Sequence, residues 1–498
     1  MLYSNYLHVL AIVSLVGALQ SPHQQAAKFL RKLVPPNPTK EAPRTANGGL
    51  FLNTKSAKFA VKGSNLPEVD FNIGESYAGS LPIGPPYMAN ANNIWFWFFP
   101  SRNPAAKKEI VIWLAGGPGC SSLQGVLQEH GPFLWQSGTN EPVSNPFSWN
   151  RLTNVIYIDQ PVGTGFSKGS ILVNNETDVA NHFMGFWKNF VDTFSIQGYK
   201  IFLTGESFAG QYIPYIAKSM LDTMDKTYFN VSVPAVPALE KYNNVIGLDS
   251  STVANIKALA DACGYTSYHA EHTSTFPPSG PIPDPPSSGT DCITWNYIVG
   301  AAFAANPCFN VYHLTDLCPA LWTELGVPTV PFAPSTPSTY FNRADVQRAI
   351  HAPRTDFLVC DKKDNVFPTG EDLSPPSGLG PLPSVIERTK NVIIAHGLLD
   401  FLLFADGSLI TIQNMTWDGL QGFRTPPSPA SNFFVPQSAT AGSGLQGVTH
   451  TERGLTFVTV NLAGHYIAQH TPGVAYRQLE FLLGRISSLE QQGTFTTG

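Results

Sequence analysis

Short apolar runs alternate with helical patterns along most of the chain. Runs that predict strands lie at 94–99, 109–114, 154–159, 201–203, 391–397 and 454–465. Apolar residues three and four positions apart predict helices at about 178–195, directly after residue 207, at 344–351 and at 475–487. Strands that alternate with helices favour an α/β fold, in which helices flank a central, mostly parallel sheet.

Residues 240–340 interrupt this alternation. They show little periodicity, contain the tract FPPSGPIPDPPSSG at 276–289 and hold four of the six cysteines. A surface insertion of this length costs a domain little loop entropy. We therefore expect one large domain over 61–498, with a cap insertion at about 240–340 that is stapled by its own disulfides.

The N-terminus carries the pattern of a targeting signal. The apolar stretch LHVLAIVSLVGAL at 7–19 has the length of a signal h-region and is too short to span a bilayer, so we expect a signal peptide at 1–20. Residues 21–60 are polar and contain proline, which leaves a propeptide, an extended arm and a surface loop open. Three sequons suit a secretory route, at Asn175, Asn230 and Asn414. The tail SSLEQQGTFTTG does not have the pattern of an anchor signal.

Composition narrows the class of protein. The 498 residues are 43% hydrophobic and only 13% charged, with a net charge of −5 and no basic stripe, so nucleic-acid binding is not expected. The cysteine and histidine spacings match no zinc motif, and we expect no metal and no cofactor. An even number of cysteines indicates three disulfides in an oxidising compartment, formed by Cys120, Cys263, Cys292, Cys308, Cys318 and Cys360.

One serine lies where a nucleophile could be held exposed. The run Ile201–Leu203 ends at Gly205, and a helical pattern with Tyr212 and Ile216 on one face follows TGESFAGQY at 204–212. Ser207 is therefore placed on the bend between a strand and a helix, above the helix N-terminus.

An acid and a base follow in the order that such a serine requires. Asp400 follows the strand-like run NVIIAHG, and His465 follows FVTVNLAG, so both are expected at the C-terminal ends of strands. Either residue alone would carry little weight, whereas the order Ser207, Asp400, His465 indicates nucleophilic acyl transfer. The run AGGPGCSS at 115–122 also follows a strand, and its glycines would let backbone N–H groups approach an oxyanion.

Several long motifs resemble those of the serine carboxypeptidases, which are α/β-hydrolase-fold exopeptidases of secretory and vacuolar compartments. The resemblance covers roughly 70–485 and looks closest to the secreted fungal branch. It is carried by WLAGGPGCSS (113–122), LQEHGPF (127–133), NPFSWNRLTNVIYIDQPVGTGFS (145–167), GESFAGQYIP (205–214), YFNRADVQRAIH (340–351) and LAGHY (462–466).

The resemblance implies a role for each site residue. It implies Ser207 as nucleophile, His465 as base, Asp400 as the acid that orients the base, and the N–H groups of Gly117 and Phe208 as oxyanion hole. It further implies that the C-terminal carboxylate of a peptide is bound at Trp113, Ala115, Gly116, Glu129 and Glu206. A glutamate binds a carboxylate only when protonated, so we expect an acidic optimum, with KM rising above about pH 6. It also suggests a Cys120–Cys360 disulfide, and a nested pairing of Cys263–Cys318 and Cys292–Cys308 then follows as a guess.

Three departures from the family pattern stand near these residues. Ala115 replaces an asparagine that would donate to the carboxylate, which predicts a loss of about tenfold in carboxylate affinity. Leu398 replaces an acid and Ala468 a proline, both in loops beside the site. Besides a carboxypeptidase secreted or delivered to a vacuole, the sequence leaves open an acyltransferase or esterase with the same triad, which Ala115 favours, and a binding protein with an inactive site.

Overall fold

The computed structural model describes residues 49–85, 92–170, 173–233, 235–236, 250–286, 292–319, 321–325, 339–360, 366–437 and 442–497. The expected signal peptide and the first part of the 21–60 segment lie outside these ranges.

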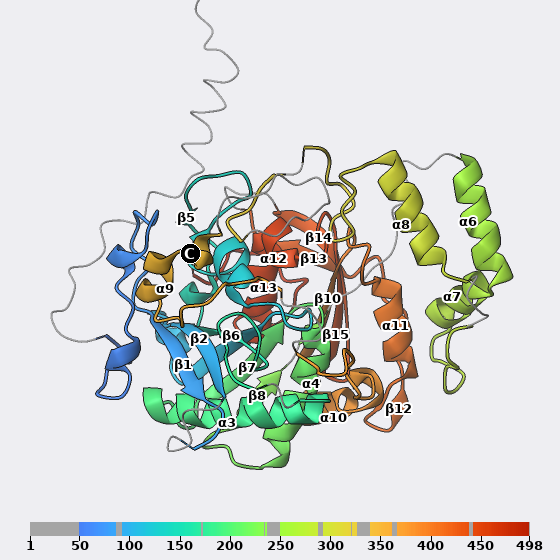
Figure 1. Ribbon diagram of the computed structural model, residues 1–498. Helices are drawn as coiled ribbons and strands as arrows, with labels where there is room; N and C mark the ends of the chain where they lie inside the picture. The colour runs from blue at the N-terminus through green and yellow to red at the C-terminus, as the bar shows by residue number, and fades with distance from the viewer. Residues whose placement is uncertain are drawn as a thin grey trace, which may run out of the picture.

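Two sheets meet edge to edge at the middle of the molecule (Figure 1). The first has the order β1-β2-β6-β3-β7-β8, and the second has the order β13-β14-β15-β10-β9. The strands of the first sheet are β1 (Tyr77–Pro82), β2 (Asn93–Phe99), β3 (Glu109–Leu114), β6 (Asn154–Asp159), β7 (Lys200–Gly205) and β8 (Asn230–Val233). Those of the second are β9 (Ala235–Val236), β10 (Val392–Gly397), β13 (Asn432–Val435), β14 (Gly444–Glu452) and β15 (Leu455–Val460).

The sheets are parallel at the centre and antiparallel at the outer edges. Strands β6, β3, β7 and β8 run parallel, as do β9, β10 and β15, whereas β1–β2, β2–β6, β13–β14 and β14–β15 pair antiparallel. The parallel strands β3, β6 and β10 are buried along their whole length, because helices cover both faces of the sheet. Two short hairpins are separate, β4 (Phe133–Leu134) with β5 (Val143–Ser144) and β11 (Thr416–Trp417) with β12 (Leu420–Gln421).

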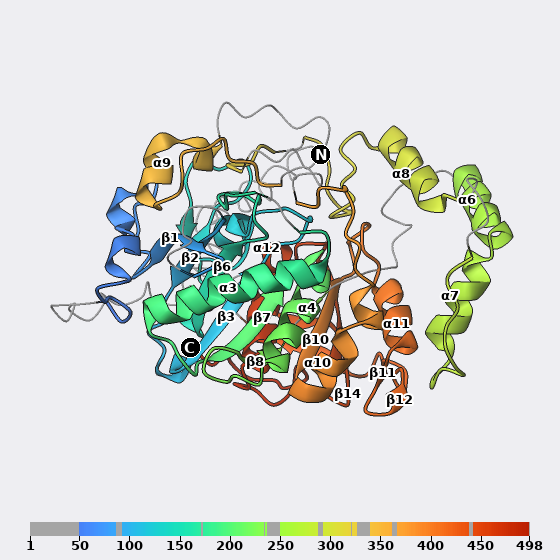
Figure 2. The ribbon, with the colours of Figure 1, turned by 60° about the horizontal axis from the view of Figure 1, so that its bottom comes forward.

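Helices lie on both faces of the central strands. Figure 2 shows α3 crossing one face, with α4 beside it, while α12 and α13 lie behind the strands. These helices are α3 (Glu176–Phe194), α4 (Ala209–Asp222), α12 (Ile467–His470) and α13 (Pro472–Leu482). Three more pack around the body, namely α9 (Ala344–Ala349), α10 (Leu382–Thr389) and α11 (Ala405–Asn414).

Aromatic rings join α3 to the antiparallel edge of the first sheet. Phe190 and Phe194 lie one turn apart on α3, and their ring centroids are 5.2 Å from Phe96 and 5.3 Å from Phe98 of β2, respectively. The described part of the N-terminal segment joins the same cluster, since the Phe59 ring lies 5.4 Å from that of Phe96. Residues 49–60 therefore belong to the folded body.

The cap insertion is more helical than its sequence indicates. It contains α6 (Ser250–Ala262), α7 (Tyr265–Ser274) and α8 (Thr294–Ala305), which stand at one side of the molecule (Figure 1). Helix α7 has no buried residue, and α8 buries only Ala302 completely. Because α6 and α7 bury so little, no sustained apolar face marks them in the sequence. Helix α8 does carry an apolar face, which packs into a small second cluster with Phe309, Leu314 and Phe401. Sequence reasoning missed this face, which is formed by Trp295, Ile298, Val299, Ala302 and Phe303.

The nested cysteine pairing expected for this insertion is wrong. Cys263 pairs with Cys292 and ties the end of α6 to the start of α8, and Cys308 pairs with Cys318 to close a loop after α8. Each bridge joins cysteines that local helix–loop geometry already brings together, 29 and 10 residues apart. The predicted Cys120–Cys360 bridge is present.

Among the described residues, no helix combines the length and the apolarity that a membrane span requires.

Candidate active site

Ser207 lies on a strained turn between β7 and α4. Its φ is +59°, in the left-handed region that non-glycine residues rarely occupy. Two glycines make room for this turn. A Cβ on Gly205 would lie 2.3 Å from the carbonyl oxygen of Leu114, and one on Gly116 would lie 2.4 Å from the backbone nitrogen of Phe208. The strand, the bend and the helix therefore present Ser207 at the C-terminal edge of the sheet, as the sequence predicts.

Asp400 and His465 form a buried hydrogen-bonded pair. They follow β10 and β15, and Nδ1 of His465 lies 2.8 Å from Oδ2 of Asp400, with both side chains almost completely buried. The other carboxylate oxygen of Asp400 accepts the backbone N–H groups of Leu402 and Leu403 at 2.9 and 3.3 Å. These hydrogen bonds fix Asp400 beside Nδ1 of His465, which is the position of the acid in a catalytic triad.

The glycine turn after β3 is held from below by a buried carboxylate. Gly117 has a φ of +110°, and the Cys120–Cys360 disulfide anchors the end of the turn. Asp159, at the end of β6, accepts the hydroxyl of Ser121 and the N–H of Ser122 at 2.7 and 3.0 Å. Burial raises the pKa of Asp159 to about 6 despite these hydrogen bonds. Sequence reasoning missed this residue, although its position at the C-terminal end of a strand was a usable signal.

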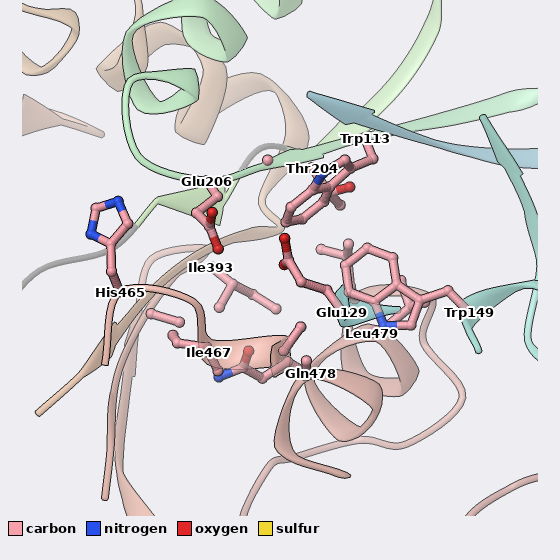
Figure 3. Close-up of a pocket in the computed structure, with 15 residues that line it drawn as sticks. Trp113, Glu129, Trp149, Thr204, Glu206, Ile393, His465, Ile467, Gln478 and Leu479 are labelled. Carbon is pink, nitrogen blue, oxygen red and sulfur yellow. The ribbon is translucent and has the colours of Figure 1, made fainter. Parts of the chain in front are cut away.

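Two glutamates point into one apolar cavity beside His465 (Figure 3). Glu129 comes from the short π-helical segment Gly125–Glu129, and Glu206 precedes the serine. The cavity has a volume of about 90 Å³, and none of the described residues that line it is Lys or Arg. Those residues are Trp113, Glu129, Trp149, Thr204, Gly205, Glu206, Ile393, Ala395, His465, Ile467, Ala468, Ala475, Gln478, Leu479 and Leu482.

Burial disfavours the ionised form of both glutamates. It raises the pKa of Glu129 to about 8, and it raises that of Glu206 well above its usual range, with smaller contributions from the charges of Glu129 and Asp400. His130 lies 3.9 Å from Glu129, yet its own burial lowers its pKa well below the usual value, so burial disfavours the charged form of this neighbour as well.

Aromatic rings shape the wall next to Glu129. His130 stacks on Trp149 with a centroid distance of 3.7 Å, and the ring of Trp113 meets it edge-on at 4.1 Å. The hydroxyl of Tyr157 lies 2.9 Å from Nδ1 of His130. Within the part of the chain that the structure describes, neither Nε1 of Trp113 nor Oε2 of Glu129 has a hydrogen-bond partner.

The structure places four of the expected site residues around one cavity. Trp113, Glu129, Glu206 and His465 line one cavity, while Ser207 and Phe208 follow Glu206 directly in the chain. Gly116 packs against this bend, and Gly117 follows it. Of the three departures, Ala468 lines the same cavity, and Leu398 lies between β10 and Asp400.

Comparison with known proteins agrees with this geometry. The family model described as serine carboxypeptidase matches residues 67–484. A carboxypeptidase Y homolog of Arthroderma benhamiae is 49% identical over 90% of this chain and 91% of its own. Serine-type carboxypeptidase F of Aspergillus niger is 39% identical, with 88% and 89% covered. The crystal structure of Kex1Δp, a prohormone-processing carboxypeptidase from Saccharomyces cerevisiae, superimposes with a TM-score of 0.66 at 25% identity, over 86% of this chain and 96% of that one.

The chain therefore belongs to the serine carboxypeptidase family, whose α/β-hydrolase fold it shares. As a member of this family it is a serine-type carboxypeptidase, which acts on peptides.

Proposed function

We propose that the enzyme releases C-terminal residues through an acyl-enzyme on Ser207. His465 takes the proton of Ser207 as general base and passes it to the leaving amine, while Asp400 holds the imidazole in the required orientation. The N–H groups of Gly117 and Phe208 stabilise the tetrahedral oxyanion. Water then attacks the ester, with His465 again as base, and the shortened peptide leaves. No metal and no cofactor takes part in these steps.

Restriction to C-termini rests on one observation, the pair of glutamates that line the cavity beside His465. Glu129 and Glu206 would donate hydrogen bonds to the terminal carboxylate of the substrate, and the indole N–H of Trp113 and the backbone of Gly116 would complete the subsite. Two ionised glutamates in the same cavity would repel that carboxylate, so acidic conditions favour binding.

The decisive experiment compares one short peptide with its C-terminally amidated twin at pH 5 by mass spectrometry, with Ser207→Ala as control. We expect loss of single residues from the free acid, much slower cleavage of the amide, and no turnover by Ser207→Ala. Equal rates on the two peptides would mean that the glutamates do not read the carboxylate. Turnover by Ser207→Ala would reject this serine as the nucleophile.

A second candidate activity is acyl transfer to an alcohol rather than to water. Ala115 supplies no side-chain donor at the position where the family uses an asparagine, so the carboxylate subsite is weaker here. Ester products formed from a peptide or ester donor in the presence of an alcohol would favour this candidate over hydrolysis.

We further propose that the protein enters the secretory pathway and is released from the cell, with a vacuole as the alternative destination. Residues 1–20 would be removed, and Asn175, Asn230 and Asn414 would carry glycans. Because residues 49–60 pack into the body, the mature N-terminus should lie between residues 20 and 49. N-terminal sequencing of the secreted protein checks the first point, and peptide mass spectrometry before and after deglycosylation checks the three asparagines.

A further inference from the structure

A disulfide-closed loop of the cap insertion lies between the two segments that carry the acid and the base. This 308–318 loop follows α8 and is closed by the Cys308–Cys318 bridge. Its backbone bonds to both sides of Asp400, since the N–H of Phe401 donates to Val311 at 2.7 Å and the N–H of Leu314 donates to Leu399 at 2.8 Å. The N–H of His465 itself donates to the carbonyl of Tyr312 at 2.7 Å.

Side chains of the 308–318 loop contact the histidine segment as well. The ring of Tyr312 meets that of His465 edge-on, with a centroid distance of 5.2 Å. His313 stacks on His470 at 3.9 Å and 11°, and Nδ1 of His470 accepts the N–H of Gly464 at 3.1 Å. The stacked pair is therefore linked by hydrogen bonding to the residue directly before His465.

A second set of contacts fixes His313 in this stack. Its Nδ1 lies 2.6 Å from Oδ1 of Asp316, and the other oxygen of Asp316 accepts the amide of Asn310 at 2.7 Å. Burial, with a smaller contribution from His313, lowers the pKa of His470 to about 3. His470 therefore keeps a free acceptor nitrogen for Gly464 under acidic conditions.

The loop and the histidine segment approach each other closely at Gly464. A Cβ on Gly464 would lie 2.2 Å from the carbonyl oxygen of Tyr312 and 2.8 Å from Cδ2 of His313. A Cβ on Gly397 would lie 2.1 Å from the carbonyl oxygen of Gly464. If the loop moves, the segments that carry Asp400 and His465 must therefore move with it.

From these contacts we infer that the 308–318 loop holds the Asp400–His465 pair in its reactive geometry, and that His313 is a positioning residue that acts through His470 and Gly464. The inference rests on the proposed roles of Asp400 and His465. It makes this loop of the cap insertion part of the structure that sets kcat.

The same loop also borders a second cavity of about 330 Å³, which Gln124, Gln128, Asn310, His313 and Tyr466 help to line. A side chain that serves as a wall for substrate changes ground-state binding and therefore KM, whereas loss of alignment in the triad changes kcat. Kinetics can thus separate the two roles.

The test compares His313→Ala with His313→Phe, which keeps an aromatic ring over His470. Active enzyme is counted by phosphonate titration, so that a smaller folded fraction does not lower kcat. We expect His313→Ala to lower kcat by about tenfold to a hundredfold with KM within about twofold. His313→Phe should recover a large part of the loss. A raised KM at unchanged kcat, or a lower melting temperature at unchanged kcat, would overturn the inference.

The two disulfides of the insertion provide a matched comparison. Replacing Cys308 and Cys318 by serine should lower kcat as His313→Ala does, whereas replacing Cys263 and Cys292, which close a more distant segment, should leave kcat unchanged. Equal losses in both double variants would show a general effect of the insertion and contradict a specific role of the loop. If Ser207→Ala is inactive while His313→Ala keeps full kcat, the loop inference alone fails. Turnover by Ser207→Ala would instead reject the proposed mechanism.

Discussion

At the scale of single residues, the cavity beside His465 contains two carboxyl groups whose ionised forms burial disfavours. Glu129 and Glu206 share a cavity lined mostly by apolar side chains, and burial raises the pKa of both. The sequence indicated a change of recognition above about pH 6, and the pKa of about 8 for Glu129 moves the expected change toward the alkaline side.

The pH dependence of KM is the first prediction at this scale. As pH rises through about 8, Glu129 loses its proton and its negative charge repels the substrate carboxylate, so KM should rise while kcat changes less. In the double variant Glu129→Gln and Glu206→Gln the groups cannot ionise, and KM should stay constant between about pH 6 and pH 9. Steady-state kinetics on a peptide and on its amide check this. A wild-type KM for the peptide that is constant over this range would contradict it.

Backbone strain next to His465 gives a second prediction. Leu462 has a φ of +58° and is 71% exposed, so its side chain gains little from burial while its backbone is strained. The left-handed region costs an L-residue about 1–2 kcal/mol. Glycine avoids this cost, but it loses more conformational entropy on folding, which offsets part of the gain. Leu462→Gly should therefore raise the free energy of unfolding by about 0.5–1 kcal/mol. Leu462→Ala keeps the Cβ and should give no gain in denaturant titrations. A gain for alanine equal to that for glycine would contradict the strain argument.

At the scale of elements, the strongly periodic segments could be predicted from the sequence. Strands β2, β3, β6 and β10 and helix α3 lie close to their expected positions, because each buries a continuous run or a regular face. Helices α6 and α7 were missed because they bury too little to show an apolar face. Helix α8 was missed although Trp295, Ile298 and Phe303 show helical spacing, because the proline-rich tract before it suggested irregular structure.

The site shows the same division. The order of Ser207, Asp400 and His465 can be read along the chain because each follows a strand. The supporting contacts of Asp159 and of the 308–318 loop could not be predicted, because they join segments far apart in sequence. The pairing of the insertion cysteines could not be predicted either, because it follows from the positions of helices α6 and α8.

Helix α3 offers a prediction that separates capping from glycosylation. The side chain of Asn175 accepts the backbone N–H of Asp178 at 3.0 Å and so caps the helix, and the same residue begins the sequon Asn175–Thr177. Asn175→Ala removes both the cap and any glycan, whereas Thr177→Ala removes only the sequon. The alanine variant at 175 should be less stable than that at 177 by about 1 kcal/mol, measured by denaturant unfolding. Equal stability of the two variants would show that the cap contributes nothing.

At the scale of the whole molecule, buried acids set the direction of the stability–pH curve. Burial raises the pKa of Glu176 to about 9, of Glu129 to about 8, of Glu324 to about 7 and of Asp159 to about 6. Unfolded carboxyl groups titrate near pH 4. Above that value the unfolded chain releases protons that the folded chain retains, so the stability contributed by these groups is lost as pH rises through each folded pKa.

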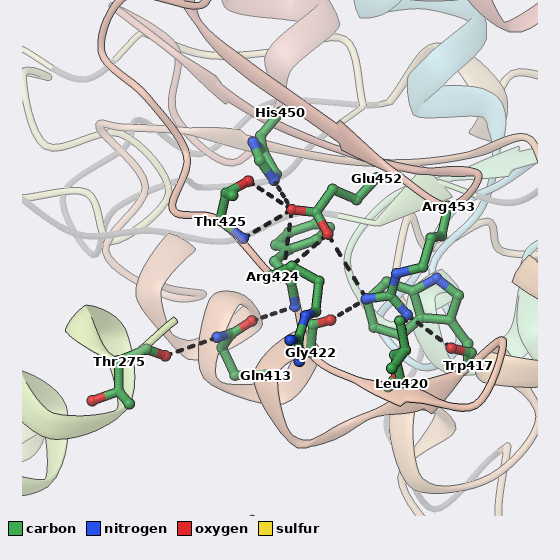
Figure 4. Close-up of polar contacts among 11 residues, drawn as sticks. Thr275, Gln413, Trp417, Leu420, Gly422, Arg424, Thr425, His450, Glu452 and Arg453 are labelled. Atoms are coloured by element: carbon green, nitrogen blue, oxygen red, sulfur yellow. Dashed lines mark hydrogen bonds and ion pairs between the residues drawn. The ribbon is translucent and has the colours of Figure 1, made fainter. Parts of the chain in front are cut away.

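One surface network acts in the opposite direction. Glu452 accepts the backbone N–H groups of Arg424 and Thr425 and lies 3.1 Å from His450 (Figure 4). Although burial opposes the effect, these hydrogen bonds lower the pKa of Glu452, and its contribution is lost as pH falls. Beside it, Arg453 covers the ring of Trp417 at 3.8 Å and donates to the carbonyl of Leu420, which holds the β11–β12 hairpin to β14. The lowered pKa values of the buried His130, His396 and His470 act in the same direction as Glu452, whereas the raised acids favour stability at lower pH. Between pH 5 and pH 8 the raised acids should therefore make stability fall as pH rises.

Glu176→Gln tests this account on a residue outside the site. Glu176 is buried at the start of α3, and within the described residues neither carboxyl oxygen has a hydrogen-bond partner. The unfolded chain ionises Glu176 near pH 4, whereas the folded chain keeps the proton up to about pH 9. Between these values the free energy of unfolding of the wild-type protein should fall by about 1 kcal/mol per pH unit, and glutamine does not incur this loss. The variant should therefore match the wild type near pH 5 and unfold at higher temperature near pH 8. Glu490→Gln, which replaces an exposed acid, is the matched control and should leave the pH dependence of the melting temperature unchanged. A wild-type protein that gains stability between pH 5 and pH 8, or a Glu176→Gln variant with an unchanged slope, would show that the buried acids do not control the curve.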